Sequence, residues 1–465
     1  MKNNTRIAIC IVIFLLLQML PWALITVAPI IVLKAQDISF SDIANEMVVS
    51  SVSMEFIEND DGTLTLKKID KNKAHGYEHI SIPKRHNGKT ITAIGDGVFL
   101  GIVGLCKVTL PDTITTIGNN AFRDCSSLAE INIPNSVEVI GNGAFGNCTN
   151  LKTIILPDGL KKIGYSTFHS SGIESIEIPD SVTDMGDNVF QYCDNLKSVK
   201  LSSGLKTIPN NAFQGSGIQQ IDIPEGITRI EEYAFSSTSL KSVTFPQSLY
   251  FIGNGAFSSC RNLTEVALPD NATTFGWHIF SNCSNLELAI LPKNLKMLPH
   301  YTFENCQKLS EVVLPDGLLE ICNSAFNNCG LTSITIPEGL IRIGDSAFYK
   351  CNKLKEIHIP DSVSRIGKKA FVACSGITEV KLPEKLTVLQ ENTFSYCTSL
   401  KSVTLGKNIT TVEHYIFDKC SKLSVVIFTG TIEEWAELEV SEMWLDGTQG
   451  VIVRCTDGDI VIENE

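Results

Sequence analysis

Cysteine is the first residue type in this chain that could carry chemistry. The 465 residues include 15 Cys, and in an exported chain such a number can indicate a disulfide framework or, where thiolates cluster, a zinc site. Eleven of them follow a recurring Phe by three residues: Cys125, Cys148, Cys193, Cys260, Cys283, Cys306, Cys329, Cys351, Cys374, Cys397 and Cys420. In a stack of coils they would lie in single file ~4.8 Å apart with parallel Cβ vectors, whereas a disulfide needs Cβ atoms about 3.5–4.5 Å apart and tilted toward each other. Because Ser171, Ser216 and Thr238 take the same position in other units, we predict small, buried, reduced packing residues.

Histidine and the carboxylates give no catalytic pattern. The sequence contains no H-E-x-x-H, G-x-S-x-G or G-x-x-x-x-G-K-[ST] motif. His300 and His414 each stand three residues before a recurring Phe. They are five repeats apart, which at ~4.8 Å per coil puts them ~24 Å from one another, too far to share a metal. We therefore predict a protein that is not an enzyme and has no catalytic, metal-binding or cofactor-binding residues.

The repeated Phe shows how these residues are organised. Its positions are Phe99, Phe122, Phe145, Phe168, Phe190, Phe213, Phe235, Phe257, Phe280, Phe303, Phe326, Phe348, Phe371, Phe394 and Phe417, and every step is 22 or 23 residues. Repetition at such a period is typical of a solenoid, in which a single unit cannot bury its apolar residues and stacked units form a continuous core. We predict one continuous stack of right-handed coils, about 15 repeats of 22–23 residues, over residues 77–430.

Each repeat reads L-x-x-I-x-I-P-x-x-V-x-x-I-G-x-x-A-F-x-x-C. The alternation in L-x-x-I-x-I predicts a half-buried strand, and the following Pro ends it. V-x-x-I-G predicts a second short extended segment, with a Gly that suits a left-handed corner. The residues around A-F-x-x-C are expected to form a tight helical turn. Fifteen coils would place the first strands in a parallel face on the order of 70 Å long.

This pattern resembles the BspA-like (Treponema-type) class of leucine-rich-repeat surface proteins. The resemblance covers roughly residues 77–430. It extends to the segment before the first coil, with Asp61-Gly62-Thr63 and Ile82-Pro83, and to an end piece with Glu434-Trp435 and Cys455-Thr456-Asp457-Gly458. It implies a cell-surface and adhesion group that has no shared catalytic residues. We expect residues 36–76 to be an N-terminal cap and residues 431–465, with Trp435, to cap the last coil.

The N-terminus predicts export. Lys2 and Arg6 precede 27 uncharged residues, 7–33, long enough as a helix to span ~30 Å of hydrocarbon. Residues 1–35 are therefore a signal peptide or an uncleaved membrane anchor, and a buried core helix is the alternative. Either of the first two puts the rest of the chain on the extracellular side, with membrane contact only through this segment. The formal net charge of −13 argues against a nucleic-acid partner, which needs clustered Lys and Arg.

The outward positions of the first strand offer one candidate binding face. Ala267, Leu288, Ile290 and Val313 are apolar on adjacent repeats, whereas most equivalent positions are small or polar. A contiguous exposed apolar area often marks an interaction site, although an atypical coil or a patch covered by neighbouring side chains would give the same pattern. We expect a surface protein that binds a protein or glycan ligand on host or neighbouring cells. A structural spacer without a specific ligand is the alternative, and the short terminal segments do not favour a catalytic unit.

Overall fold

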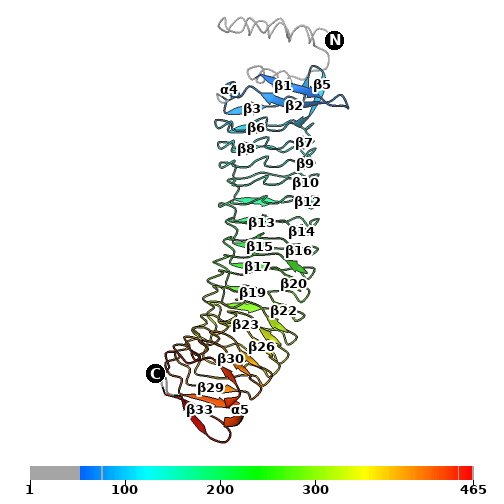
Figure 1. Ribbon diagram of the computed structural model, residues 1–465. Coiled ribbons are helices and arrows are strands. Elements are labelled where there is room, and N and C mark those ends of the chain that lie inside the picture. The colour runs from blue at the N-terminus through cyan, green and yellow to red at the C-terminus, as the bar shows by residue number, and fades with distance from the viewer. Residues whose placement is uncertain (1–52, 75–76, 449, 463–465) are drawn as a thin grey trace, which may run out of the picture. The chain divides into compact units, whose positions relative to one another are not determined.

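The computed structural model describes residues 53–74, 77–448 and 450–462, so the N-terminal segment of residues 1–35 lies outside the described residues. Successive coils stack on one another from β3 (His79–Ser81) to β33 (Val451–Arg454) (Figure 1). Each full coil carries two short extended segments and one turn segment. The predicted solenoid with a parallel strand face is confirmed. Within the described residues, no helix is both long and apolar enough to cross a bilayer.

The first strands of the coils lie along one side of the stack, where they pair in several short parallel ladders, and we call this side the first-strand face. Its strands are β3, β6 (Lys107–Thr109), β8 (Glu130–Ile131), β11 (Ser175–Glu177), β13 (Ser198–Lys200), β15 (Gln220–Asp222), β17 (Ser242–Thr244), β19 (Glu265–Ala267), β21 (Leu288–Ile290), β23 (Glu311–Val313), β27 (Glu379–Lys381), β29 (Ser402–Leu405), β31 (Val425–Phe428) and β33. A single bridge, Thr335 to His358, continues this face between β23 and β27.

The second extended segment of each coil builds a second-strand face across the Pro-containing corner. Its strands are β5 (Lys89–Ile94), β7 (Thr116–Ile117), β9 (Val139–Ile140), β10 (Lys162–Ile163), β12 (Asp184–Met185), β14 (Thr207–Ile208), β16 (Arg229–Ile230), β18 (Phe251–Ile252), β20 (Thr274–Phe275), β22 (Met297–Leu298), β24 (Glu320–Ile321), β25 (Arg342–Ile343), β26 (Arg365–Ile366), β28 (Val388–Leu389), β30 (Thr411–Val412) and β32 (Glu439–Val440). These segments are mostly two residues long because the Pro corner and the next corner leave room for no more.

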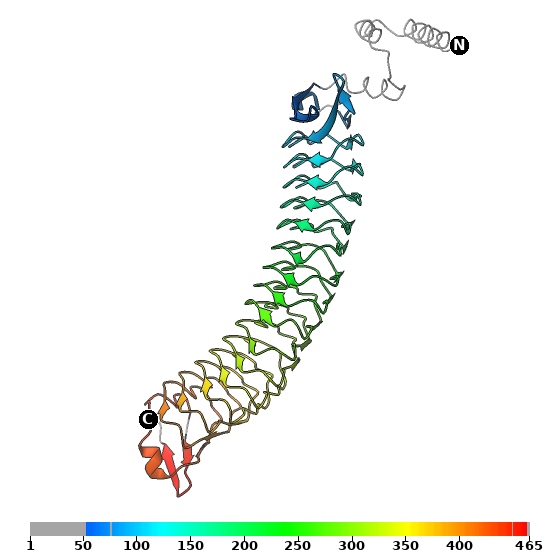
Figure 2. The ribbon, with the colours of Figure 1, turned by 90° about the vertical axis from the view of Figure 1, so that its right-hand side faces the viewer.

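The repeated Phe forms the centre of the core. All fifteen rings are fully buried, and successive rings stack with centroids 4.8–5.9 Å apart from Phe99 to Phe417. Each ring therefore covers the next, which a single repeat cannot achieve alone. Figure 2 shows the coils following one another in chain order, and the apolar core runs through them as one cluster from Leu64 to Cys455.

The segment around each Phe is not the helical turn that the sequence predicted. The residues two before and two after each Phe have left-handed φ, as in Asn120 (51°) and Asp124 (61°) around Phe122. This alternation points every second N–H toward the next coil, so that the Phe122 N–H donates to Ala144 O at 2.8 Å while the Arg123 N–H donates within its own turn to Asn120 O at 3.2 Å. A helix would bond only within itself, whereas this turn also links the coils.

The corner Gly is also not left-handed, in contrast to the prediction. Gly141 has an ordinary negative φ, but a Cβ built on it would lie 2.6 Å from the carbonyl carbon of Gly118 in the preceding coil. In three of the four 22-residue repeats a second Gly is confined more tightly, as at Gly172, where a Cβ would lie 2.0 Å from Thr149 O. Both glycines are needed for the close approach of one coil to the next.

Additional elements close the two ends of the stack. Before the first coil, β1 (Met54–Glu58) and β2 (Leu64–Ile69) form an antiparallel pair, and β2 also pairs in parallel with β5. The short helix α4 (Lys71–Ala74) follows β2 in the chain, and β4 (Arg85–His86) pairs antiparallel with β5. At the other end, β32 and β33 continue the two faces, α5 (Ile432–Ala436) lies between β31 and β32, and β34 (Asp459–Ile462) pairs antiparallel with β33. Trp435 is buried against Phe428 and Trp444, and Trp444 also contacts Phe417. These contacts cover the end of the Phe stack.

Candidate binding surfaces

The thiols that the sequence singled out are part of the core. All eleven at the repeated position are buried, which confirms the predicted burial. Each donates a hydrogen bond to the backbone carbonyl of the Phe in the preceding coil, with sulfur–oxygen distances of 2.9–3.2 Å. Burial raises the pKa of Cys125 and of Cys351 to about 12, so these thiols stay protonated and unreactive at neutral pH.

Ser and Thr reproduce this hydrogen bond poorly where they replace Cys. Thr238 donates instead to the carbonyl of Phe235 in its own coil at 2.8 Å, and the buried Ser216 hydroxyl has no hydrogen-bond partner. Across the described residues, no group of three or more His, Cys, Asp or Glu side chains could hold a metal ion. The role of the Cys series is structural: its hydrogen bonds to the Phe carbonyls link each coil to the preceding one.

The predicted face residues lie together on three consecutive strands, and the predicted register is confirmed. Ala267 pairs with Ile290, and Ile290 pairs with Val313. Ile290 is 40% exposed, Val313 is 47% exposed and Ala267 is also exposed. Ala289, which precedes Ile290 in the same strand, points inward and is fully buried. Leu288 is half-buried on the same strand as Ile290. We call these four residues, Ala267, Leu288, Ile290 and Val313, the central patch.

Elsewhere the first-strand face is largely polar and internally paired. Lys200 forms an ion pair with Glu177 on the neighbouring strand, and Lys107 pairs with Glu130 at 2.5 Å. Ile155 is the contrasting case. It is 86% exposed and holds the same coil position as Ile290, but its equivalents on the adjacent coils are Asn132 and Glu177. An isolated exposed Ile needs no explanation, so adjacency is what distinguishes the central patch.

A second apolar surface, which the sequence reasoning missed, lies on the second-strand face of the same part of the stack. Met297, Leu319 and Ile341 come from three consecutive coils and are 42–50% exposed. The Ile341 N–H donates to Leu319 O at 2.8 Å, so these two residues hold equivalent positions on adjacent coils. Met297 belongs to the coil before Leu319 and is in register with Glu320, one residue further along the chain. We call the three exposed residues the second-strand patch. They occupy the two x positions of V-x-x-I, where most other coils carry Thr, Lys, Glu or another polar residue, so aligning the repeats at these positions would have found them.

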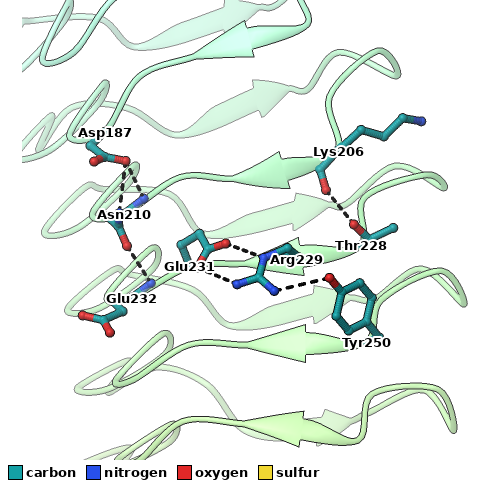
Figure 3. A network of polar contacts seen from close by, with 8 residues as sticks. All are labelled: Asp187, Lys206, Asn210, Thr228, Arg229, Glu231, Glu232 and Tyr250. Atoms are coloured by element: carbon teal, nitrogen blue, oxygen red, sulfur yellow. Dashed lines mark hydrogen bonds and ion pairs between the residues drawn. The ribbon is translucent and has the colours of Figure 1, made fainter.

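A polar groove lies nearer the N-terminal end, between the coils that carry Asp187, Asn210 and Glu232. Figure 3 shows its bonding: Asp187 accepts from the Asn210 N–H at 3.0 Å, and Asn210 accepts from the Glu232 N–H at 3.1 Å. Nearby, Arg229 is held by Glu231 at 2.7 Å and lies 3.8 Å from the ring centre of Phe251. The side chains of this groove are engaged in linking coils, so the groove is part of the scaffold.

The fold defines a class before any relative is considered: a leucine-rich-repeat solenoid with a core of stacked Phe and a parallel strand face. The family model described as the BspA type leucine rich repeat region matches residues 72–197, 115–239, 228–351 and 319–438. The chain belongs to this family.

Solved structures of bacterial leucine-rich-repeat proteins resemble the chain. One is a leucine-rich repeat protein from Bacteroides ovatus, 27% identical, with a TM-score of 0.67, covering 88% of this chain and 99% of its own. Another is a leucine rich cell surface protein from Faecalibacterium prausnitzii, 25% identical, with a TM-score of 0.43 and coverage of 83% and 96%. No curated protein matched the chain. The similarity to the Bacteroides ovatus protein supports the leucine-rich-repeat fold of this chain.

Proposed function

We propose that this chain is a binding protein of the cell surface or the extracellular space, with its contact surface on the coils between Leu263 and Ile343. The observation that carries the proposal is the position of the central patch. Ile290 and Val313 are exposed side by side on a face that is largely polar elsewhere. Exposed apolar side chains on adjacent strands can be buried by a partner, contributing about 1.5–3 kcal/mol each. The second-strand patch on the same coils supports this location.

Extracellular location rests on the sequence of residues 1–35, whose basic start and long apolar run are those of an export signal or anchor. The partner we propose is a protein or a glycan on host or neighbouring cells, which would make adhesion the biological role. A rigid stack of coils suits this task, because it fixes the exposed residues of successive coils at constant spacing without ordering cost on binding.

The double change Ile290→Asp with Val313→Asp tests the proposal. Purified full chain would be applied to an array of extracellular matrix proteins and glycans and to intact cells, and the double variant should lose at least tenfold in apparent affinity. The matched control is Ile155→Asp, which makes the same change at the same coil position outside the patch and should bind as the unmodified chain does.

Thermal melting separates the outcomes. Because all three side chains are exposed, each variant should melt close to the unmodified chain. Equal binding by the double variant and the unmodified chain would contradict the proposed surface. Failure of the unmodified chain to bind any probe would instead favour a structural spacer.

A further inference from the structure

A repeated hydrogen bond runs along the residues that stand three before each Phe. In most coils the side chain at this position accepts the backbone N–H of the equivalent residue in the next coil, as Asp96 does for Asn119 at 2.6 Å and Asn119 does for Asn142 at 2.9 Å. The steps Asp187–Asn210–Glu232 in Figure 3 are part of this series. We call it the polar ladder. It supplies an acceptor to a backbone group that the coil geometry otherwise leaves without one.

Trp277 interrupts the polar ladder. Its own N–H donates to Asn254 Oδ1 at 2.8 Å, but an indole has only a donor, so its side chain cannot accept the N–H of His300 in the next coil. The ladder resumes at His300, whose Nδ1 accepts from the Asn323 N–H at 3.2 Å. The indole is 57% exposed. Tyr165, which is 56% exposed, also stands at a ladder position, so an exposed ring there is not unique to Trp277; the aromatic neighbours of Trp277 distinguish it.

Trp277 does not stand alone. The His300 ring lies edge-on to it with centroids 5.4 Å apart, and His300 is 6.3 Å from Tyr301. Tyr301 in turn stacks flat on His278 at 4.3 Å with an interplanar angle of 5°. Four rings from two adjacent coils therefore form a continuous group on the turn side of the stack, which we call the aromatic platform: Trp277, His278, His300 and Tyr301.

Polar groups border the aromatic platform. Glu304 Oε2 lies 3.6 Å from His278 Nδ1, and Glu304 Oε1 accepts from the side chain of Asn327 at 3.2 Å, so the carboxylate is fixed in place. The Tyr301 hydroxyl and the imidazole of His278 add groups that can donate or accept. The combination is a largely exposed indole beside hydrogen-bond donors and acceptors.

We propose that the aromatic platform binds a neutral sugar ring, such as a terminal galactose or glucose, with the indole of Trp277 covering the C–H face of the sugar. A pyranose has one flat apolar face and hydroxyls around its edge, which matches an exposed ring bordered by a phenol, an imidazole and a carboxylate. His278 and Tyr301 cover each other's ring faces, so the group is not the open box of rings that encloses a quaternary ammonium ion. Glu304 and the net charge of −13 disfavour sialic and uronic acids.

This inference deepens the proposed function, because it assigns a ligand class to the same coils that carry the central patch. A single sugar on an open platform binds weakly, since little of its surface is covered. The ligand must therefore be presented in many copies, as on a cell surface or mucin, where avidity raises the apparent affinity.

The test uses the full chain on a glycan array that carries galactose-terminated, glucose-terminated and sialylated oligosaccharides at high density. The unmodified chain should bind the neutral glycans more strongly than the sialylated ones, and Trp277→Ala should lower that binding about tenfold or more. The matched control is Tyr165→Ala. Tyr165 holds the same ladder position and is 56% exposed, but its ladder neighbours are Asn142 and Asp187, so this change should leave binding intact.

Two further variants keep the outcome clear. Trp277→Phe retains a ring and should retain part of the binding, and the Ile290→Asp, Val313→Asp pair distinguishes this inference from the proposed function. Matrix-protein binding that depends on the central patch, without binding of neutral glycans, would overturn the sugar site and leave the proposed function standing. Equal glycan binding by Trp277→Ala and the unmodified chain, or an equal loss with Tyr165→Ala, would also overturn it.

Discussion

Two regions of the stack share one core and differ in their surfaces. In the N-terminal region, represented by Phe145 and Cys148, and in the central region, represented by Phe303 and Cys306, the ring and the thiol are fully buried and each thiol donates to the Phe carbonyl one coil earlier. The first-strand face differs, with the ion pair of Lys200 and Glu177 in one region and the exposed Ile290 and Val313 in the other.

The comparison shows which positions are free to vary. Core positions contact the coil before and the coil after, so a change in one coil is felt in two others. Outward positions have no such constraint, and polar residues are the default there. Single departures from that default occur elsewhere, as at Ile155 and Tyr165, but the central patch, the second-strand patch and the aromatic platform lie on three sides of the same few coils. This gathering is the reason for assigning function to the central region.

The largest difference between the regions should appear at alkaline pH. Burial raises the pKa of nine thiols at the repeated Cys position, three of them in the N-terminal region (Cys125, Cys148 and Cys193) and six from Cys283 to Cys397. Because the folded chain favours the protonated thiol, this stability is fully present below the unfolded pKa near 9 and is lost as pH rises through the folded values. The loss is about 1.4 kcal/mol per thiol for each pH unit.

Limited proteolysis at pH 7.5 and at pH 10.5, with a protease active at both, measures this difference. The first new cleavages at the higher pH should fall between Cys260 and Cys420. Replacing Cys351 and Cys374 with Ala should shift the onset of cleavage to higher pH. Cleavage that begins among the N-terminal coils would show that the thiols do not control alkaline stability.

Equal core substitutions should cost the same in both regions. Phe145→Ala and Phe303→Ala each remove a fully buried ring that stacks on the Phe of the coil before and of the coil after, at 5.3–5.7 Å. Each should lower the free energy of unfolding by about 3–5 kcal/mol, measured from urea unfolding followed by circular dichroism. A difference of more than about 2 kcal/mol between the two would mean that the cores are not equivalent.

The repeat period made the core predictable from sequence, because the regular spacing of Phe, Leu, Ile and Cys indicates which residues face inward in every coil. The same period fixed the register that places Ile290 beside Val313. The turn around Phe was not predictable in this way, because residues as different as Asn, Ser, Tyr and Lys occupy its left-handed positions. The corner Gly was predicted correctly in position but for the wrong reason. A side chain is excluded there because it would clash with the backbone of the preceding coil, and the φ of the Gly itself is not left-handed.

The aromatic platform was missed for a related reason. Trp277 and His300 are 23 residues apart, as are His278 and Tyr301, and at these positions most coils carry polar or small residues, so no apolar pattern marks them. Only the stacking of coils turns that separation into ring contact. Aligning the repeats and looking for aromatic residues at consecutive ladder positions would have revealed the group.

The smallest expected effect tests whether Trp277 is kept for stability or for binding. Trp277→Asn puts the usual ladder residue into this coil and offers an acceptor to the N–H of His300, as Asn254 does for Trp277 at 2.8 Å. The change should therefore raise the free energy of unfolding by about 0.5–1.5 kcal/mol, the net value of one hydrogen bond. The loss of the contact between the indole and His300 reduces this gain. A rise in melting temperature together with loss of glycan binding would show that the chain retains a less stable residue because it contacts a ligand. A clear fall in melting temperature would assign Trp277 a structural role, and the contrast between the central and N-terminal surfaces would then rest on the central patch and the second-strand patch.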